Sequence, residues 1–192
     1  MKLKLLMTSA ALALTMNAGA MAQTGGAMSG GAQTAPMVGG APMYPTKNII
    51  ENAVNSKDHT TLVAAVKAAG LVQTLEGPGP FTVFAPTNEA FAALPAGTVD
   101  TLLKPENKAK LTQVLTYHVV PGRYDAATLA KDAKAAGGRV SLKTVEGEPL
   151  IVSQNGAMLM VTDTKGGSAQ VTIPDVFQSN GVIMVVNKVL MP

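Results

Sequence analysis

The hydrophobic pattern of this chain changes once, at Gly138, and this change restricts the folds that the chain can adopt. Between residues 48 and 118 most apolar residues recur at helical spacing, as Leu111, Val114 and Leu115 do. After Gly138 the pattern alternates, which predicts strands at residues 139–145, 150–153, 157–163, 169–173 and 181–190. Helices grouped first and strands grouped last predict an α+β domain, in which a curved antiparallel sheet or sandwich carries the helices at one side.

Turn residues separate the predicted strands. Asn155-Gly156 and Asn180-Gly181 are pairs that favour positive φ, and we therefore expect a tight hairpin at each. The run at residues 182–186 is apolar without interruption, which is typical of a strand covered on both faces. We expect this last strand near the centre of the sheet.

One segment of the helical half is also predicted to be a strand. Residues 81–85 alternate aromatic and β-branched side chains, which suits a strand buried on both faces. Pro86 ends this pattern, and Thr87 can cap a helix that carries Phe91 and Leu94. The sequence therefore predicts a buried strand that leads directly into a short helix.

The N-terminus has the pattern of a secretory signal peptide. Lys2 and Lys4 precede an uncharged apolar run at residues 5–14, and Ala20-Met21-Ala22 is a small-x-small cleavage pattern. The apolar run is too short to span a bilayer in the ordinary way, although an uncleaved anchor is the rival interpretation. We predict a signal peptide at residues 1–22, cleaved after Ala22, and a secreted or periplasmic protein that is not a transmembrane protein.

Residues 23–44 have a composition typical of a flexible linker. Gly-Gly-Ala occurs three times among Ser, Gln, Thr and Pro, and the segment has no charged residue. Small side chains bury too little apolar area to offset the ordering of the backbone. We predict a disordered Gly/Ala-rich linker at 23–44 and one folded domain at 45–192.

Charge and cysteine content exclude several classes of function. Without the two lysines of the predicted signal peptide, 13 basic residues face 12 acidic ones, so a nucleic-acid partner is not expected. The chain has no cysteine, which excludes disulfides, thiolate metal sites and cysteine catalysis. Its two histidines, His59 and His118, do not form a metal-ligand spacing, and no Gly-x-Ser-x-Gly motif occurs. We predict no catalytic residue, no metal site and no cofactor.

Two segments carry a family resemblance. They are residues 81–94, with the sequence FTVFAPTNEAFAAL, and residues 117–122, with the sequence YHVVPG. In this order, and with the closing segment at residues 179–190, they resemble the signature segments of the fasciclin (FAS1) domain family. The resemblance covers about residues 46–191 and identifies a bacterial secreted protein with a single FAS1 domain. It implies a β-sandwich wedge with helices along one edge, and adhesion or surface interaction in place of catalysis.

The resemblance also points to two groups of candidate binding residues. Tyr117 and His118 match a Tyr-His pair that resembles a receptor-binding determinant of animal members. The alternative is burial, because His118 continues the helical stripe of Leu111, Val114 and Leu115.

The second group is Pro174, Asp175, Val176 and Phe177, where animal FAS1 domains carry an integrin-recognition segment of the Pro-Asp-Ile type. We expect Pro174 to end the preceding strand and Asp175 to lie at an exposed bend beside Val176 and Phe177. The alternative is an ordinary Asx turn. The chain has no Arg-Gly-Asp motif, and Gly122-Arg-Tyr-Asp125 is only superficially similar to one.

These observations favour a non-catalytic adhesion or interaction module that binds a surface protein or glycan, and they leave weak self-association open. The alternative is a small-ligand or lipid-binding domain that uses a crevice between the helices and the sheet. The two differ in what the fold must contain. A ligand site requires a sizeable apolar cavity, whereas adhesion requires an exposed patch.

Overall fold

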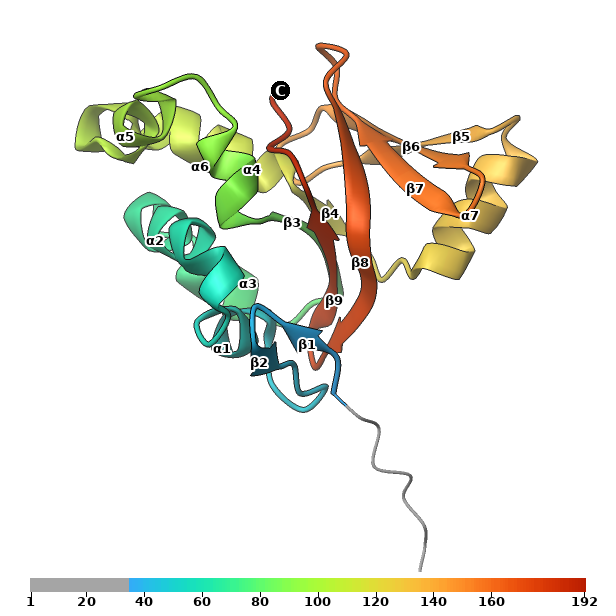
Figure 1. The fold of residues 1–192 in the computed structure, drawn as a ribbon, viewed down its shortest axis with the longest axis horizontal. Coiled ribbons are helices and arrows are strands. Elements are labelled where there is room, and N and C mark those ends of the chain that lie inside the picture. The colour runs from blue at the N-terminus through green and yellow to red at the C-terminus, as the bar shows by residue number, and fades with distance from the viewer. Residues whose placement is uncertain (1–34) are drawn as a thin grey trace, which may run out of the picture. The chain divides into compact units, whose positions relative to one another are not determined.

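The computed structural model describes residues 35–192 (Figure 1). The predicted signal peptide and residues 23–34 of the predicted linker lie outside the described residues. The helices are α1 (Ile49–Ala53), α2 (Thr60–Ala69), α3 (Val72–Glu76), α4 (Asn88–Ala92), α5 (Thr98–Leu103), α6 (Lys108–Tyr117), α7 (Ala126–Ala135) and the 3₁₀ turns η1 (Lys57–His59) and η2 (Pro105–Asn107). The strands are β1 (Met37–Val38), β2 (Ala41–Pro42), β3 (Phe81–Pro86), β4 (Val119–Pro121), β5 (Arg139–Lys143), β6 (Pro149–Asn155), β7 (Met158–Thr162), β8 (Ser168–Gln178) and β9 (Gly181–Val186).

Side-chain caps fix the starts of several helices. Asn48 and Glu51 form a reciprocal capping box at α1, in which the Asn48 side chain accepts from the Glu51 N–H and the Glu51 carboxylate accepts from the Asn48 N–H, both at 2.8 Å. Thr87 caps α4 as predicted, since its Oγ1 accepts from the Ala90 N–H at 3.3 Å. No helix in residues 35–192 is long and apolar enough to cross a membrane.

The main sheet has seven strands in the order β4-β3-β9-β8-β7-β6-β5. All neighbours pair antiparallel except β3 and β9, which pair parallel, so the expectation of a wholly antiparallel sheet is wrong. The exception arises because β9 lies between two strands. It pairs antiparallel with β8, its hairpin partner, and parallel with β3, the strand of the helical half. The predicted α+β class is confirmed.

Strand β8 belongs to both halves of the sheet, which diverge from it as a wedge in Figure 1. Its pairing with β9 is irregular between Val171 and Ile173 and again between Ile173 and Val176. At the other end of the sheet the Val145 N–H donates to the Val119 carbonyl at 2.8 Å, which joins the end of β5 to β4. The sheet therefore curls around its own apolar face.

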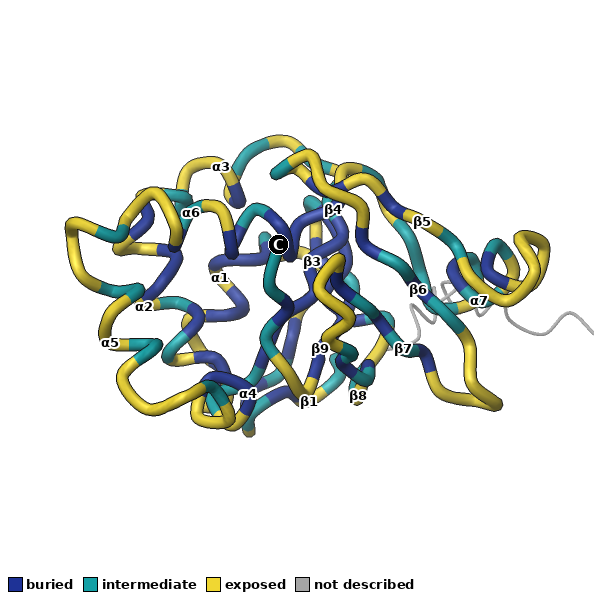
Figure 2. The backbone as a smooth tube through the Cα atoms, turned by 90° about the horizontal axis from the view of Figure 1, so that it is seen from above, coloured by how far each residue is buried: buried dark blue, intermediate teal, exposed yellow. Residues whose placement is uncertain are grey.

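Two apolar cores lie on opposite faces of β3 and β9. Val83 and Ile183 point into the first core, between the sheet and the helices, whereas Phe84 and Met184 point into the second, between the two halves of the sheet. Figure 2 shows the buried backbone concentrated in this central region, with the exposed segments outside it. Full burial of one such side chain stabilises the fold by about 1.5–3 kcal/mol. The apolar run at 182–186 is thus central, as its pattern predicts.

The predicted start of the domain at residue 45 is too late. Strands β1 and β2 form a hairpin at residues 37–42, and the hairpin packs on the helices. Val38 is 3 % exposed and Met43 is 1 % exposed, so both belong to the first core. The segment contains few large side chains, but these two pack into a core that is made mostly of residues from the rest of the domain. The composition of the segment alone cannot reveal this packing.

Gly39→Ala should destabilise the protein by about 3 kcal/mol, roughly 2 kcal/mol more than Gly40→Ala. Both glycines have positive φ, at 58° and 75°, so both substitutions carry the backbone strain of a left-handed residue. A Cβ on Gly39 would also lie 2.4 Å from Ser56 Oγ and 2.6 Å from the Asp58 nitrogen, whereas a Cβ on Gly40 meets no atom within 4 Å. Urea denaturation of both variants measures the difference. Equal losses would mean that the hairpin does not pack on η1.

Candidate functional site

Tyr117 and His118 lie at the end of α6, inside the fold. Tyr117 is 0 % exposed, and its hydroxyl donates to the Pro149 carbonyl at 3.0 Å and accepts from the Thr164 N–H at 3.2 Å. Burial raises the pKa of this phenol. Tyr117 therefore links α6 to the strands of the second core, and its side chain is not on the surface.

His118 is 2 % exposed, and both of its ring nitrogens are hydrogen-bonded. Nδ1 lies 2.8 Å from the Val114 carbonyl, and Nε2 accepts from the Leu190 N–H at 3.0 Å. These partners define a neutral ring with the proton on Nδ1. Burial lowers the pKa of His118 to about 4. The arrangement agrees with the alternative of burial, because the ring ties α6 to the C-terminal segment and offers no atom to a partner.

The segment from Pro174 to Phe177 is not the exposed bend that the sequence predicts. Pro174 does not end the strand, since β8 continues to Gln178 through an irregular pairing with β9. Asp175 has a φ of 58° and is the one non-glycine residue with positive φ within residues 35–192. Pro174 is exposed and Phe177 is half-buried, but Val176 is 0 % exposed and belongs to the first core. Val176 therefore cannot form part of a surface patch.

The irregular part of β8 meets the loop between β4 and α7. Asp175 Oδ1 accepts from the Ala126 N–H at 2.6 Å, at the first residue of α7. Asp125, the N-cap of this helix, accepts from the Thr128 N–H at 2.6 Å. Hydrogen bonding to Thr128, first through its side chain and then through its backbone N–H, lowers the pKa of the Asp125 carboxyl. The Arg123 guanidinium lies 5.0 Å from the centroid of the Phe177 ring. We name this group, consisting of Arg123, Asp125, Pro174, Asp175 and Phe177, the α7 junction.

Backbone contacts hold the loop of the α7 junction in place. The hydroxyl of Thr82, on β3, donates to the Gly122 carbonyl at 2.8 Å and accepts from the Tyr124 N–H at 2.9 Å. Arg123 therefore projects from a loop anchored to the sheet on one side and to α7 on the other. Sequence reasoning missed Arg123 as a site residue, because some 50 positions separate it from Phe177 and no local signal relates the two.

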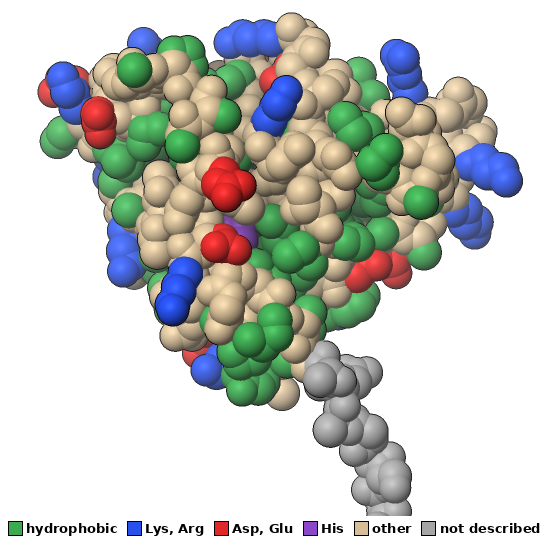
Figure 3. Space-filling view, viewed as in Figure 1, with side chains coloured by type: hydrophobic (Ala, Val, Ile, Leu, Met, Phe, Trp, Pro, Cys, Tyr) green, Lys and Arg blue, Asp and Glu red, His purple; other side chains and the backbone are tan. Residues whose placement is uncertain are grey.

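The chemistry of the α7 junction suits contact with a partner. An exposed cation stacked on an aromatic ring, an exposed proline and a half-buried carboxylate share one surface. Within residues 35–192 no group of three or more His, Asp or Glu side chains could hold a metal ion. On the face in Figure 3, basic and acidic side chains are interspersed, and basic ones also project from the end that α7 and β5 form. Lys131, Lys134, Arg139 and Lys143 are exposed on these elements.

The crevice that a lipid-binding domain would need is a small cavity lined almost entirely by buried residues. It lies between the helices and strands β3 and β9, and its volume is about 40 Å³. Ligand pockets for drug-sized molecules have volumes of about 300–1,000 Å³. The cavity therefore lies where the alternative function places it, but it does not hold a lipid chain in this conformation.

Comparisons with known proteins agree with this geometry. The family model described as Fasciclin domain matches residues 57–192. Protein sll1483 of Synechocystis is 49 % identical over 146 residues, which cover 75 % of this chain and 73 % of that protein. Transforming growth factor-beta-induced protein ig-h3 of Sus scrofa is 34 % identical over 151 residues, which cover 77 % of this chain and 20 % of that protein.

The fold also occurs in solved structures. An example is a FAS1 domain pair from the insect cell adhesion molecule Fasciclin I, with a TM-score of 0.68 and 17 % identity. The similarity covers 76 % of this chain and 51 % of that one, so this chain spans about half of the domain pair.

Proposed function

Because the chain belongs to the fasciclin domain family, we propose that it is an adhesion or interaction module without catalytic activity, whose partner is a protein or glycan at a cell surface. The family relationship supports this class of function, since Fasciclin I, whose domain pair shares this fold, is an insect cell adhesion molecule. The signal-peptide pattern at residues 1–22 supports export, which would bring the domain to such a partner.

The α7 junction is the surface that we propose for the partner. The observation that carries this proposal is the contact between Arg123 and Phe177, which joins two distant segments into one exposed feature. Arginine and aromatic side chains are enriched where binding energy concentrates in interfaces. The anchored loop and the irregular strand hold this pair in place before binding, so little conformational freedom would be lost on association.

Arg123→Ala should weaken binding of the mature protein to its partner surface by about fivefold or more. The side chain is exposed, so its loss should leave the unfolding free energy almost unchanged. Binding is measured on whole cells and on arrays of immobilised matrix proteins and glycans. The control is Lys131→Ala, which removes an exposed cation of α7 outside the junction. Equal binding of wild type, Arg123→Ala and Lys131→Ala would overturn the assignment of the surface.

The role of Asp175 needs a different substitution. Asp175→Ala would place alanine at a φ of 58° and remove the carboxylate that accepts from Ala126, so it would disturb the fold as well as the surface. Asp175→Asn keeps an oxygen acceptor and a residue type that tolerates positive φ, and it removes only the charge. Weaker binding by Asp175→Asn at unchanged stability would show that the partner recognises the carboxylate.

A further inference from the structure

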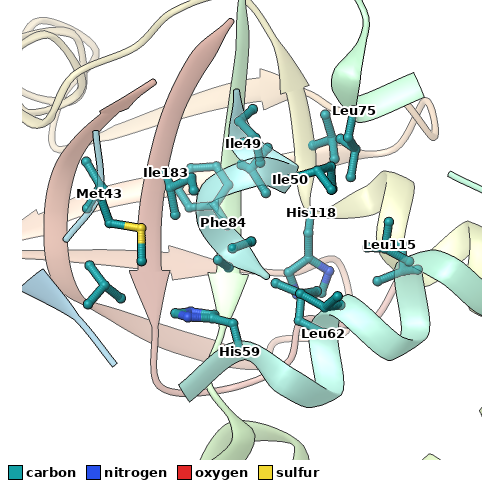
Figure 4. A pocket seen from close by; sticks show the side chains of 18 residues that line it. Met43, Ile49, Ile50, His59, Leu62, Leu75, Phe84, Leu115, His118 and Ile183 are labelled. Atoms are coloured by element: carbon teal, nitrogen blue, oxygen red, sulfur yellow. The ribbon is translucent and has the colours of Figure 1, made fainter. Parts of the chain in front are cut away.

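The small cavity between the helices and the sheet has almost entirely apolar walls. Figure 4 shows the side chains around it, among them Met43 beside the hairpin, Ile50, Leu62 and Leu115 from the helices and Ile183 from β9. Its volume of about 40 Å³ exceeds the roughly 10–15 Å³ that one water molecule requires. Voids of this kind are few in a protein domain.

One polar atom in this cavity has no partner. His59 is 3 % exposed, and its Nδ1 lies 2.9 Å from Ser56 Oγ, but its Nε2 has no hydrogen bond within residues 35–192. In Figure 4 the ring extends from η1 toward β3 and β9, beside Met43. His118 also lines the cavity, but both of its nitrogens are satisfied. A buried nitrogen without a partner is rare and calls for an explanation.

The surroundings of His59 keep its ring neutral. Burial lowers its pKa, and the nearby Ala85 carbonyl and the Asp58 carboxylate oppose this shift without reversing it. The Ala85 carbonyl is thus close to the ring, but it does not meet hydrogen-bond geometry with Nε2. A neutral donor or acceptor among apolar walls favours an uncharged molecule.

A water molecule would fit this cavity poorly. A buried water normally makes two to four hydrogen bonds, and within residues 35–192 His59 Nε2 is the one buried side-chain atom that lacks a partner. We propose instead that the cavity binds a small uncharged molecule with an apolar body and a single hydrogen-bonding oxygen, such as an alcohol or a ketone, whose oxygen pairs with His59 Nε2. This ligand site is independent of the proposed adhesion surface, since the α7 junction shares no residue with it.

The β1–β2 hairpin limits the size of the molecule. A cavity of about 150 Å³ binds benzene, so the present volume admits only molecules smaller than benzene unless a wall moves. Val38 and Met43 form part of the wall, and both come from the hairpin segment. Methionine adapts to irregular space more readily than branched side chains do. Longer alcohols would therefore enter by displacing Met43.

The test uses 1-propanol, 1-butanol and xenon as probes of the mature protein, followed by methyl NMR shifts of Met43, Ile50 and Ile183. We expect saturable shifts at these methyl groups with all three probes. His59→Phe should weaken the alcohols by about fivefold or more and leave xenon, which makes no hydrogen bond, within about twofold. If His59→Phe fails to fold, Met43→Ala provides the second arm, because the enlarged cavity should shift the preference toward 1-hexanol.

Three results would overturn the proposal. One is the absence of saturable shifts at the lining methyl groups with every probe. Another is an equal effect of His59→Phe on the alcohols and on xenon. The third is a tightly held water on His59 Nε2 that none of the probes displaces. Loss of adhesion in Arg123→Ala with unchanged alcohol binding would confirm that the two sites are separate.

Discussion

Gly181→Ala should lower the free energy of unfolding by more than about 4 kcal/mol or prevent folding altogether. A Cβ at this position would lie 2.1 Å from the Phe81 carbonyl oxygen and 3.0 Å from the Phe81 carbonyl carbon. Both are backbone atoms of β3, which pairs with β9 in register from Phe81 and Gly181 onward. A side-chain rotation cannot relieve the contact, so the two central strands must separate at this end. Urea denaturation followed by circular dichroism measures the loss.

The matched control is Gly156→Ala, since Gly156 also follows an asparagine in a hairpin turn. Gly156 has a φ of 63°, and a Cβ there would meet no atom within 4 Å. Alanine should cost only the strain of positive φ, about 1 kcal/mol. Similar losses in the two variants would mean that the strands can move apart at Gly181 without penalty, and would contradict the packing described for β3 and β9.

Removal of the buried imidazole in His118→Ala should lower the unfolding free energy by about 3–5 kcal/mol. The substitution leaves the Leu190 N–H without its acceptor and opens a cavity beside α6.

Acid should have a related effect on the stability of the wild type. The pKa of His118 in the folded protein, about 4, lies below the ordinary histidine pKa of 6.5, so His118 contributes its full stability above pH 6.5. This contribution, on the order of 3 kcal/mol, is lost as the pH falls from 6.5 to 4.

His118→Gln separates the titration from the packing. Glutamine can place an oxygen near the Nε2 position, and it does not titrate. The unfolding free energy of this variant should vary less between pH 7 and pH 4 than that of the wild type. A smaller slope of the same sign should remain, because burial also lowers the pKa of His59. An unchanged slope in His118→Gln would show that His118 is not the group responsible.

Several features of the fold could be predicted because they depend on neighbouring residues. The Thr87 cap needs only the Ala90 N–H three residues away, and the apolar run at 182–186 has no polar position that could face water. The change of pattern at Gly138 separates helices from strands for the same reason, because side chains return to the same face at one fixed spacing in a helix and at another in a strand. These local rules gave the α+β class and the order of helices before strands, but not the β1–β2 hairpin or α7.

Asn180-Gly181 shows where local rules stop. The pair predicts a hairpin turn, and it does connect β8 to β9. Gly181, however, does not adopt a positive φ, and what requires glycine is the approach of Phe81 from a strand 100 positions earlier. The Asn180 side chain donates to the Leu75 and Gly77 carbonyls at 2.7 and 3.1 Å and accepts from the Ile49 N–H at 3.1 Å. No pattern within the turn indicates these partners.

The candidate site divides in the same way. Tyr117, His118 and the segment at 174–177 could be selected from the sequence, but not whether each side chain is buried. Pro174 predicts the end of a strand, whereas β8 continues through Asp175, which adopts a positive φ and whose carboxylate accepts from the Ala126 N–H of α7. Arg123 became a site residue only through its contact with Phe177.

The sequence by itself therefore determined the α+β class of this protein, its helices before its strands and the buried strands at 81–86 and 181–186, because hydrogen bonding and side-chain period are set within a few residues. The tertiary structure alone decided that residues 37–43 belong to the core, that β3 and β9 pair parallel, that His118 is buried and that His59 faces a cavity. Whether a side chain is buried depends on which distant segments pack against it. That packing is determined by the whole domain together, so it cannot be read from any short segment of the sequence.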